Sequence, residues 1–287
     1  MKVGFSLLHY NNVSVTIEAV DYLKQLVDIE NAEIVIVDNA SPNGSGKQLQ
    51  TLYMNDSNIH VILNEKNGGF AYGNNIGYRY AKDELGCSII LVMNNDIYIK
   101  DTNFISKLVE TDEECSAEII APNIIGRKGT QNPFRLNRLS DRRVKRMYRY
   151  NSVMNLVYHV PGINSVVAYV LDKKSATKQN TMKSIKDGEC CIPHGACVIY
   201  RKPWINKENI AFVPDTFMYF EEDVLGEYMA KKGYKAFYSS HLTVYHVEDA
   251  SVEYDNKTSV KKRKFISGCM KKSIKVLIDL RNEKRSI

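Results

Sequence analysis

The sequence predicts an α/β fold with a mostly parallel central sheet flanked by helices, and three features indicate it. Apolar segments of strand length alternate with longer segments of helical periodicity through the first half of the chain. Residues 88–99, SIILVMNNDIYI, contain the continuous apolar run that is typical of a strand buried on both faces of a sheet. Polar residues follow each of the first four apolar segments, at the carboxyl ends where parallel sheets bind ligands.

The first half of the chain predicts four strands, each followed by a helix. We expect the strands at residues 2–8, 33–37, 59–63 and 89–93. The first helix is predicted to extend from Val13 to Val27, with Asn12 or Ser14 as its cap. A second helix passes through Leu49 and Leu52, and a third follows the glycine-rich loop NEKNGGFAYGNNIG. A fourth helix and a short strand are expected within residues 101–122.

The second half of the chain is less regular. Residues 126–190 show little periodicity, and the only element predicted there is a helix from Met147 to Val160. Residues 193–202 predict a strand, and a helix that begins at Glu221 ends at Gly233, which suits a helix C-terminus. A strand and the segment HLTVYHVEDAS follow, and the tail from Lys261 onward is predicted to be helical and basic.

Composition limits the class of protein. The 287 residues carry a formal net charge of +6, and no apolar stretch is long enough to cross a bilayer. The N-terminus resembles a first strand and lacks a signal cleavage site, so we expect a cytoplasmic protein. Of the six cysteines, four lie in or beside apolar runs and are predicted to be buried free thiols: Cys87, Cys115, Cys197 and Cys269. Cys190 and Cys191 have no partner pair at zinc spacing.

The polar cluster after the fourth strand is a candidate metal site. Asn94 and Asp96 offer oxygen atoms, which suit a hard cation such as Mg²⁺ or Mn²⁺, and such an ion would hold a diphosphate. The alternative is a polar turn that hydrogen-bonds its own backbone, which is the commoner role of such a cluster. His246 follows a later apolar segment and is a second candidate ligand, although a lone histidine is more often structural.

The glycine pattern excludes two nucleotide-binding classes. A dinucleotide-binding fold places G-x-G-x-x-G directly after the first strand, where this chain has His9-Tyr10-Asn11-Asn12. The P-loop lysine pattern is absent as well. The sequence therefore supports neither a classical dehydrogenase nor a P-loop enzyme.

Three acidic residues, Glu221 to Asp223, open the helix that follows FMYF. Acids at a helix N-terminus interact favourably with the helix dipole, so capping is one interpretation. Three consecutive acids exceed what capping needs, and an exposed, ionised aspartate can accept a proton from a substrate hydroxyl. A general base is the other interpretation.

Taken together, the ordered motifs VDNAS, NGGFAYGNNIG, LVMNND, HGACVIYRK, FEED and YHVEDAS resemble those of inverting glycosyltransferase family 2, which has the GT-A fold. The likeness is greatest to the rhamnosyltransferase-like branch of bacterial surface-polysaccharide enzymes. It covers about residues 1–125 and 190–252, and it implies a metal-dependent enzyme that transfers a hexose from a nucleoside-diphosphate sugar. UDP- or dTDP-linked donors and a glycan or lipid-linked acceptor are the expected substrates, with rhamnose as the sugar by analogy.

The resemblance implies roles for individual residues. The nucleotide-sugar would contact Tyr10, Asp38, Asn39, Asn67, Gly68, Gly69, Gly73, Asn74 and Asn95. The metal ligands would be Asp96, Asn94 and His246. Asp223 would be the catalytic base, with Glu222 beside it. Asn94 stands where the family has an aspartate, and Leu225 and Met229 stand where it has an acid and an arginine, so local packing or acceptor contacts are expected to differ.

This resemblance divides the chain into a GT-A domain at residues 1–256 and a basic amphipathic helix at residues 257–287. Within the domain, residues 1–125 would bind the nucleotide-sugar and residues 126–256 the acceptor. The terminal helix would either contact the inner face of the plasma membrane or pack within a monomer or homodimer. Nucleic-acid binding is not expected, because aromatic residues do not interleave with the basic runs. Two other functions fit the same pattern: a catalytically silent scaffold and a nucleotidyltransferase.

Overall fold

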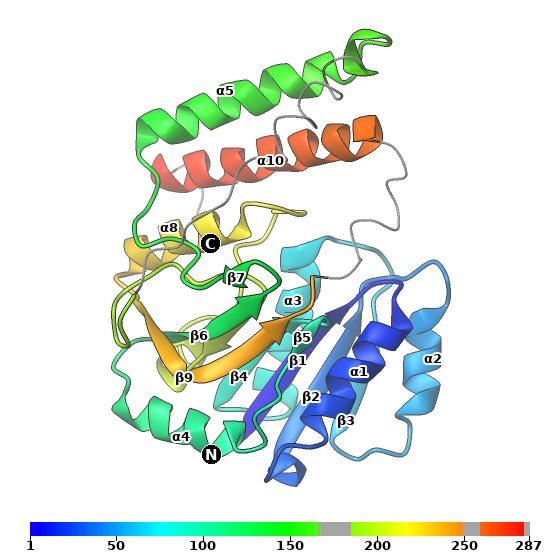
Figure 1. Cartoon of the computed structure of the whole chain (residues 1–287), viewed down its shortest axis with the longest axis vertical. Helices are drawn as coiled ribbons and strands as arrows, with labels where there is room; N and C mark the ends of the chain where they lie inside the picture. The colour runs from blue at the N-terminus through cyan, green and yellow to red at the C-terminus, as the bar shows by residue number, and fades with distance from the viewer. Residues whose placement is uncertain (166, 168–184, 249–258, 284–287) are drawn as a thin grey trace.

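A computed structural model describes residues 1–165, 167, 185–248 and 259–283 of the chain (Figure 1). Nine strands form a single sheet in the order β3-β2-β1-β4-β8-β6-β9-β5, with β7 paired to β6. The strands are β1 (Val3–His9), β2 (Ala32–Asp38), β3 (Ile59–Leu63), β4 (Ile89–Asn94), β5 (Ile97–Tyr98), β6 (Ile119–Gly126), β7 (Gly129–Thr130), β8 (Cys197–Tyr200) and β9 (Ala236–His246).

The first four strands are parallel, as the sequence predicts. The register pairs His9 of β1 with Asp38 of β2, and Leu8 with Asn94 of β4. The polar residues that end these strands therefore gather at one edge of the sheet. β8 runs antiparallel to both β4 and β6, and β9 runs parallel to β6, so the sheet is mixed but mostly parallel.

Helices cover both faces of the sheet. The helical segments are α1 (Val13–Leu23), the 3₁₀ turn η1 (Ile29–Asn31), α2 (Ser45–Leu52), α3 (Phe70–Arg79), the π-helical turn η2 (Tyr80–Glu84), α4 (Phe104–Glu114), α5 (Asp141–Val157), α7 (Lys202–Ile205), α8 (Glu221–Lys232) and α10 (Ser259–Arg281). Alternation along the strands builds two cores: Ile34 and Ile36 pack on the side of α1, and Val35 and Val37 on the side of α3.

Three predicted boundaries differ from the structure. α1 ends at Leu23 and not at Val27, because the N–H groups of Gln25 and Leu26 bond carbonyls three residues back, and Val27 is left exposed. α5 begins at Asp141, earlier than the predicted Met147, since Ser140 caps a first turn that is basic and carries little apolar signal. β8 is shorter than the predicted 193–202, as only residues 197–200 pair with β4.

The cysteine prediction is largely confirmed. Cys87, Cys197 and Cys269 are buried free thiols, whereas Cys115 is only partly buried. Burial raises the pKa of Cys87 to about 12, so this thiol is not ionised at neutral pH. Cys191 is buried as well, and its neighbour Cys190 is exposed.

The basic tail forms α10, which lies between α5 and α8 (Figure 1). Its apolar residues Ile274, Leu277 and Leu280 are buried in the core that also contains α8. Gly268 permits a close approach of α5, because a Cβ there would lie 3.2 Å from the amide of Asn155. The apolar side chains of α10 are therefore used for packing within the chain. No helix in the described part has the length and apolar character to span a membrane.

Candidate active site

A cavity of about 690 Å³ opens at the carboxyl edge of the parallel strands. Its wall combines the ends of β1 and β4, the loop before α3, the first turn of α8 and one side of α10. The cavity is lined by nine of the residues that the sequence assigns to a site: Tyr10, Asn39, Asn67, Gly69, Asn94, Asn95, Asp96 and, on α8, the Glu222-Asp223 pair. One cavity thus joins residues from the expected donor, metal and catalytic groups.

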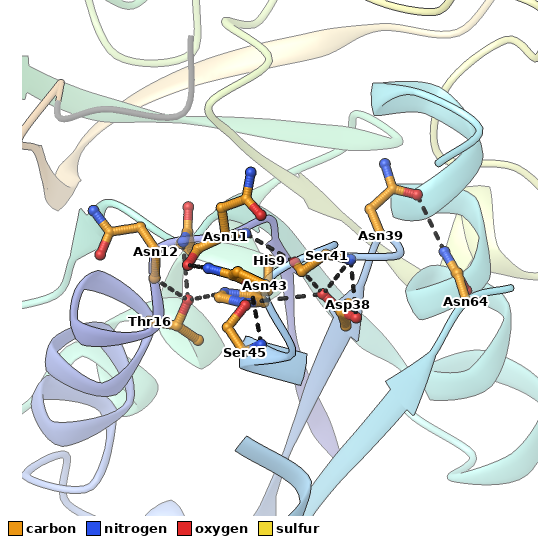
Figure 2. A network of polar contacts seen from close by, with 11 residues as sticks. His9, Asn11, Asn12, Thr16, Asp38, Asn39, Ser41, Asn43, Ser45 and Asn64 are labelled. Carbon is orange, nitrogen blue, oxygen red and sulfur yellow. Dashed lines mark hydrogen bonds and ion pairs between the residues drawn. The ribbon is translucent and has the colours of Figure 1, made fainter. Parts of the chain in front are cut away.

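A buried histidine fixes the first loop (Figure 2). His9 makes hydrogen bonds through Nδ1 to Thr16 Oγ1 at 2.7 Å and through Nε2 to Ser45 Oγ at 2.8 Å. Burial lowers the pKa of His9 to about 4, so the ring is neutral at pH 7. Asn95 also donates to Thr16 Oγ1, at 2.9 Å, which ties the cluster after β4 to the same network.

Asp38 lies in this network and does not line the cavity. Its carboxylate accepts from the backbone N–H and the hydroxyl of Ser41, and its Oδ1 lies 4.0 Å from Nε2 of His9. A Cβ at Gly46 would overlap the carboxyl, so the group is closely enclosed. A contact between Asp38 and a nucleotide remains a prediction.

Hydrogen bonds fix the position of the loop before α3 at the cavity. Asn39 donates through Nδ2 to Asn67 Oδ1 at 3.0 Å and to the carbonyl of Gly69 at 3.1 Å. Gly69 has a φ of 88°, and the N–H of Phe70 donates to the carbonyl of Phe217 at 2.6 Å. The loop from β2, the start of α3 and the aromatic loop before α8 therefore form one connected wall.

Three other donor-binding candidates lie behind this wall. Gly68 and Gly73 are sites of close packing, because a Cβ would meet Tyr72 at the first and Leu8 at the second. Asn74 is buried, and neither polar atom of its side chain has a hydrogen-bond partner in the described part of the chain. These three residues are not among those that line the cavity.

Asp96 and His246 lie close together, as the family resemblance implied. Nε2 of His246 lies 3.3 Å from Oδ1 of Asp96, and that oxygen is buried without a hydrogen bond in the described structure. Nδ1 of His246 contacts Oε1 of Gln131 at 2.7 Å, and Gln131 in turn donates to Glu248. With Nδ1–H donating to Gln131, the unprotonated Nε2 faces a carboxylate oxygen. Two acceptors in that position suit a shared cation.

The residues at this point fit a divalent ion. A carboxylate oxygen and an imidazole nitrogen are accepted by Mn²⁺, and Mg²⁺ is commonly held by one or two carboxylates together with substrate phosphates. Asn94 lines the same cavity and is the third candidate. In the described residues no group of three or more His, Cys, Asp or Glu side chains forms a complete site, so the substrate would supply further ligands.

The acidic turn of α8 is buried, which differs from the exposed aspartate that the sequence suggested. Asp223 is 3% exposed and accepts from Arg135 at two points, with Nε at 2.7 Å from Oδ1 and an Nη at 3.3 Å from Oδ2. Burial raises the pKa of Asp223, and the Arg135 guanidinium opposes that shift. The carboxyl is therefore a stronger base than an exposed aspartate, while its ionised form retains a partner.

The two neighbouring glutamates have different environments. Glu222 accepts from the backbone N–H of Gly195 at 3.3 Å, and burial raises its pKa. Glu221 is buried with one carboxylate oxygen lacking any hydrogen-bond partner in the described structure. Burial, with the adjacent charge of Glu222, raises the pKa of Glu221 to about 8, so this side chain is mostly protonated at neutral pH.

Three residues of the site were not found from the sequence. Arg135 and Gln131 lie in a segment of the sequence without clear periodicity, and their partners are 88 and 115 residues away. His194 lines the cavity, and burial lowers its pKa to about 4. The motif HGACVIYRK contains His194, so its position in a short polar turn before β8 was the available signal.

Packing explains why α8 carries Leu225 and Met229 where the family has an acid and an arginine. Leu225 and Met229 are buried on the side of α8 that faces the core with α10. Glu227, on the same helix, forms ion pairs with Arg138 at 2.8 Å and with Arg281 at 2.7 Å. These contacts fasten α8 to the segment before α5 and to the end of α10.

The sheet order and the cavity at its carboxyl edge define a GT-A fold, the architecture of nucleotide-diphospho-sugar transferases. The chain belongs to glycosyl transferase family 2, whose family model matches residues 7–207.

Two curated proteins are similar to part of the chain. The low-salt glycan biosynthesis hexosyltransferase Agl10 of Haloferax volcanii is 37% identical over 98 residues, which are 34% of this chain and 30% of that protein. Glycosyltransferase GlyG of Streptococcus pneumoniae serotype 4 is 31% identical over 115 residues, 40% of this chain and 36% of that protein. The match thus spans about a third of each relative.

Solved structures share the fold at low identity. S. aureus TarS 1-349 in complex with UDP-GlcNAc superposes with a TM-score of 0.57 and 15% identity, over 88% of this chain and 60% of that chain. The mannosyltransferase PcManGT of Pyrobaculum calidifontis, in complex with GDP-Man and Mn²⁺, has a TM-score of 0.54 and 11% identity, over 99% of this chain and 76% of that chain.

Proposed function

We propose that the chain transfers a sugar from a nucleoside-diphosphate donor to a hydroxyl of an acceptor, with inversion at the anomeric carbon. The observation that carries the proposal is the convergence of Asp96, Asn67 and Asp223 on one cavity. Two similarities support it: that of the sequence to the hexosyltransferase Agl10, and that of the fold to TarS 1-349 in complex with UDP-GlcNAc. UDP- or dTDP-linked sugars are the proposed donors.

The wall formed by the ends of β1 and β2 and by the loop before α3 would bind the donor. Tyr10, Asn39 and Asn67 present an aromatic ring and amides to the cavity. The hydrogen bonds between Asn39 and Asn67 keep the amides in place before a ligand arrives, which lowers the entropic cost of binding. Asn94 and Asn95 complete this side of the site.

A divalent ion, Mg²⁺ or Mn²⁺, would be held by Asp96 and His246, with Asn94 beside them. When bound, it would supply positive charge to the diphosphate as that group leaves. The chain's own contribution is the orientation of its ligands: Gln131 holds Nδ1 of His246, so that Nε2 is directed at Asp96.

Asp223 is the proposed general base. Its carboxylate accepts the proton of the acceptor hydroxyl, the hydroxyl oxygen forms a bond to the anomeric carbon, and the bond to the diphosphate oxygen breaks with its electron pair. Arg135 positions the carboxylate by its two-point contact. Glu222 lies beside it and accepts from Gly195.

The acceptor side of the cavity is rich in apolar surface. The rings of Phe217 and Tyr219 both contact Phe265 edge to face. Their centroids lie 6.1 Å (Phe217) and 6.4 Å (Tyr219) from that of Phe265. Such surfaces suit the C–H faces of a glycan, and we propose a glycan or lipid-linked acceptor. Rhamnose as the transferred sugar rests on the sequence resemblance alone.

The test is a transfer reaction with UDP- and dTDP-linked sugars, glycan fractions and Mn²⁺, analysed by NMR of the product. We expect consumption of one donor and a product of inverted anomeric configuration. A retained configuration would remove Asp223 from its proposed role. Release of pyrophosphate from a nucleoside triphosphate, without sugar transfer, would favour a nucleotidyltransferase instead.

A further inference from the structure

The outward face of α5 carries basic side chains along its first half and mainly apolar side chains along its second half. Its first half presents the cations Arg142, Lys145, Arg146 and Arg149, all exposed. Its second half presents Tyr150, Val153 and Leu156, which are 53%, 59% and 70% exposed. At 3.6 residues per turn, these seven positions fall within an arc of about 140° on one side of the helix.

The opposite side of α5 is occupied. Val144 and Asn151 are buried there, Met147 lines the cavity, and Asn155 approaches Gly268 of α10. The orientation of the helix is therefore fixed by packing, and the exposed apolar side chains are not a consequence of a loosely placed helix. The apolar surface continues past the helix in Val160 and Ile163, both exposed.

The cations of this face have no counter-charge in the described structure. Asp141 is the single acid among residues 127–149, which include nine Lys or Arg, and it pairs with Arg281 at 2.6 Å. No carboxylate of the described residues pairs with Arg142, Arg146 or Arg149. The face is thus strongly positive at one end and apolar at the other.

We propose that this face of α5 is a docking surface for an anionic lipid bilayer. α5 lies beyond α10, on the side of that helix away from the sheet (Figure 1). Arginine side chains would contact lipid phosphates, while Val153 and Leu156 enter the boundary between headgroups and acyl chains. A bilayer complements the charge and the apolar surface together along the whole helix. The proposal does not depend on the transfer reaction.

This assignment places the membrane contact on a different element from the terminal helix. The buried apolar side chains of α10, such as Leu277, would have to leave the core before they could enter lipid. Those of α5 are already exposed. Met147 lines the cavity from the inner side of α5, so the proposed bilayer surface would lie about one helix diameter, roughly 10 Å, from the site.

The experiment is vesicle co-sedimentation of the full chain. Vesicles of phosphatidylcholine alone are compared with vesicles in which about one lipid in four is phosphatidylglycerol, at low and high salt. Arg142→Gln/Arg146→Gln/Arg149→Gln removes three cations of the face, and Val153→Ser/Leu156→Ser removes its apolar part. The matched controls change exposed residues elsewhere: Lys47→Gln/Arg79→Gln/Lys202→Gln and Leu52→Ser/Met54→Ser.

We expect salt-sensitive binding to the anionic vesicles only. Each cation near such a surface contributes about 5-fold to partitioning, so the triple variant of α5 should bind about 100-fold more weakly. The apolar double variant should lose about 10-fold or more, and both controls should bind like the parent chain. All variants should melt like the parent, since the changed side chains are exposed.

Three results would overturn the proposal. The first is absence of vesicle binding by the intact chain. The second is an equal loss of binding in the α5 variants and in their controls. The third is a concentration-dependent dimer in light scattering that Val153→Ser/Leu156→Ser abolishes while vesicle binding is unaffected, which would assign the face to another copy of this chain.

Discussion

Arg135, in the segment before α5, holds Asp223 of α8 by a two-point ion pair, with Nε 2.7 Å from Oδ1. Asp223 lines the cavity and is almost fully buried, so the pair places a fixed positive charge at the proposed base. Burial alone would raise the pKa of this carboxyl further, and the guanidinium opposes that shift. Arg135 thus connects the least regular segment of the sequence to the proposed chemistry.

Arg135→Gln should shift the pH dependence of turnover. Without the guanidinium, the pKa of Asp223 rises, and the acidic limb of the kcat profile should move to higher pH. Arg135→Lys keeps a charge without the two-point geometry and should give an intermediate profile. Arg138→Gln is the control, because it breaks an ion pair with Glu227 on the same helix. Equal profiles for the two glutamine variants would refute a specific role of Arg135.

Asp223→Asn should abolish most transfer while nucleotide binding persists. A general base contributes about 10²- to 10⁴-fold, and the amide cannot accept the proton. Donor affinity, measured by calorimetry, should stay close to that of the parent. Asp112→Asn removes an acid that pairs with Arg201 instead, and should leave kcat near the parent value. Unchanged turnover in Asp223→Asn would remove this residue as the base.

Glu221 should make stability depend on pH. Burial raises its pKa from 4.5 to about 8, so the folded state favours the protonated form. The contribution is fully present below the ordinary pKa of 4.5 and is lost as pH rises through 8. Glu221→Gln mimics the protonated group, so its free energy of unfolding should exceed that of the parent increasingly over this range. The exposed Glu113→Gln should show no such trend, and a parallel trend there would argue against the assignment.

Gly69→Ala should destabilise the fold more than Gly44→Ala. Both glycines have positive φ, 88° and 77°. Gly44 is left-handed helical, where alanine loses roughly 1 kcal/mol, whereas Gly69 has a ψ of −174°, in a region open essentially only to glycine, so its variant loses more through backbone strain. At Gly69 a Cβ would also overlap the backbone of Phe217, whereas nothing lies within 4 Å at Gly44. Urea unfolding measures the difference. Equal losses would mean that the contact between the loop before α3 and the aromatic loop is not tight in solution.

The sequence predicted the parts of the fold that are encoded locally. Continuous apolar runs located β1 to β4, and the acid-rich start and Gly233 located α8. The basic start of α5 hid the first part of that helix, before Met147, because Arg142 and Arg146 face solvent and leave no apolar period to detect. The turns that follow Leu23 and end α1 also have no strong signal in the sequence.

The candidate site, like the fold, was predictable only where its residues lie in locally recognisable segments. Asp96 and Asp223 follow recognisable segments, so they could be chosen before the structure was known. Arg135 and Gln131 could not, since each acts through a partner that is distant in the sequence and close only in the fold. Burial of Asp223 was also missed, because the segment that contains Arg135 packs against a turn that looks exposed in the sequence.

A thermal-shift panel tests most directly whether Asp96 forms part of a nucleotide-sugar site. UDP, dTDP, GDP and CDP are each added with and without Mn²⁺, to the parent chain and to Asp96→Asn and His246→Gln. A ligand that binds only the folded state raises the melting temperature according to its concentration over Kd. We predict a Mn²⁺-dependent rise with UDP or dTDP that both variants reduce. No rise with any nucleotide, from well-folded protein, would contradict the account and favour a scaffold without catalytic activity.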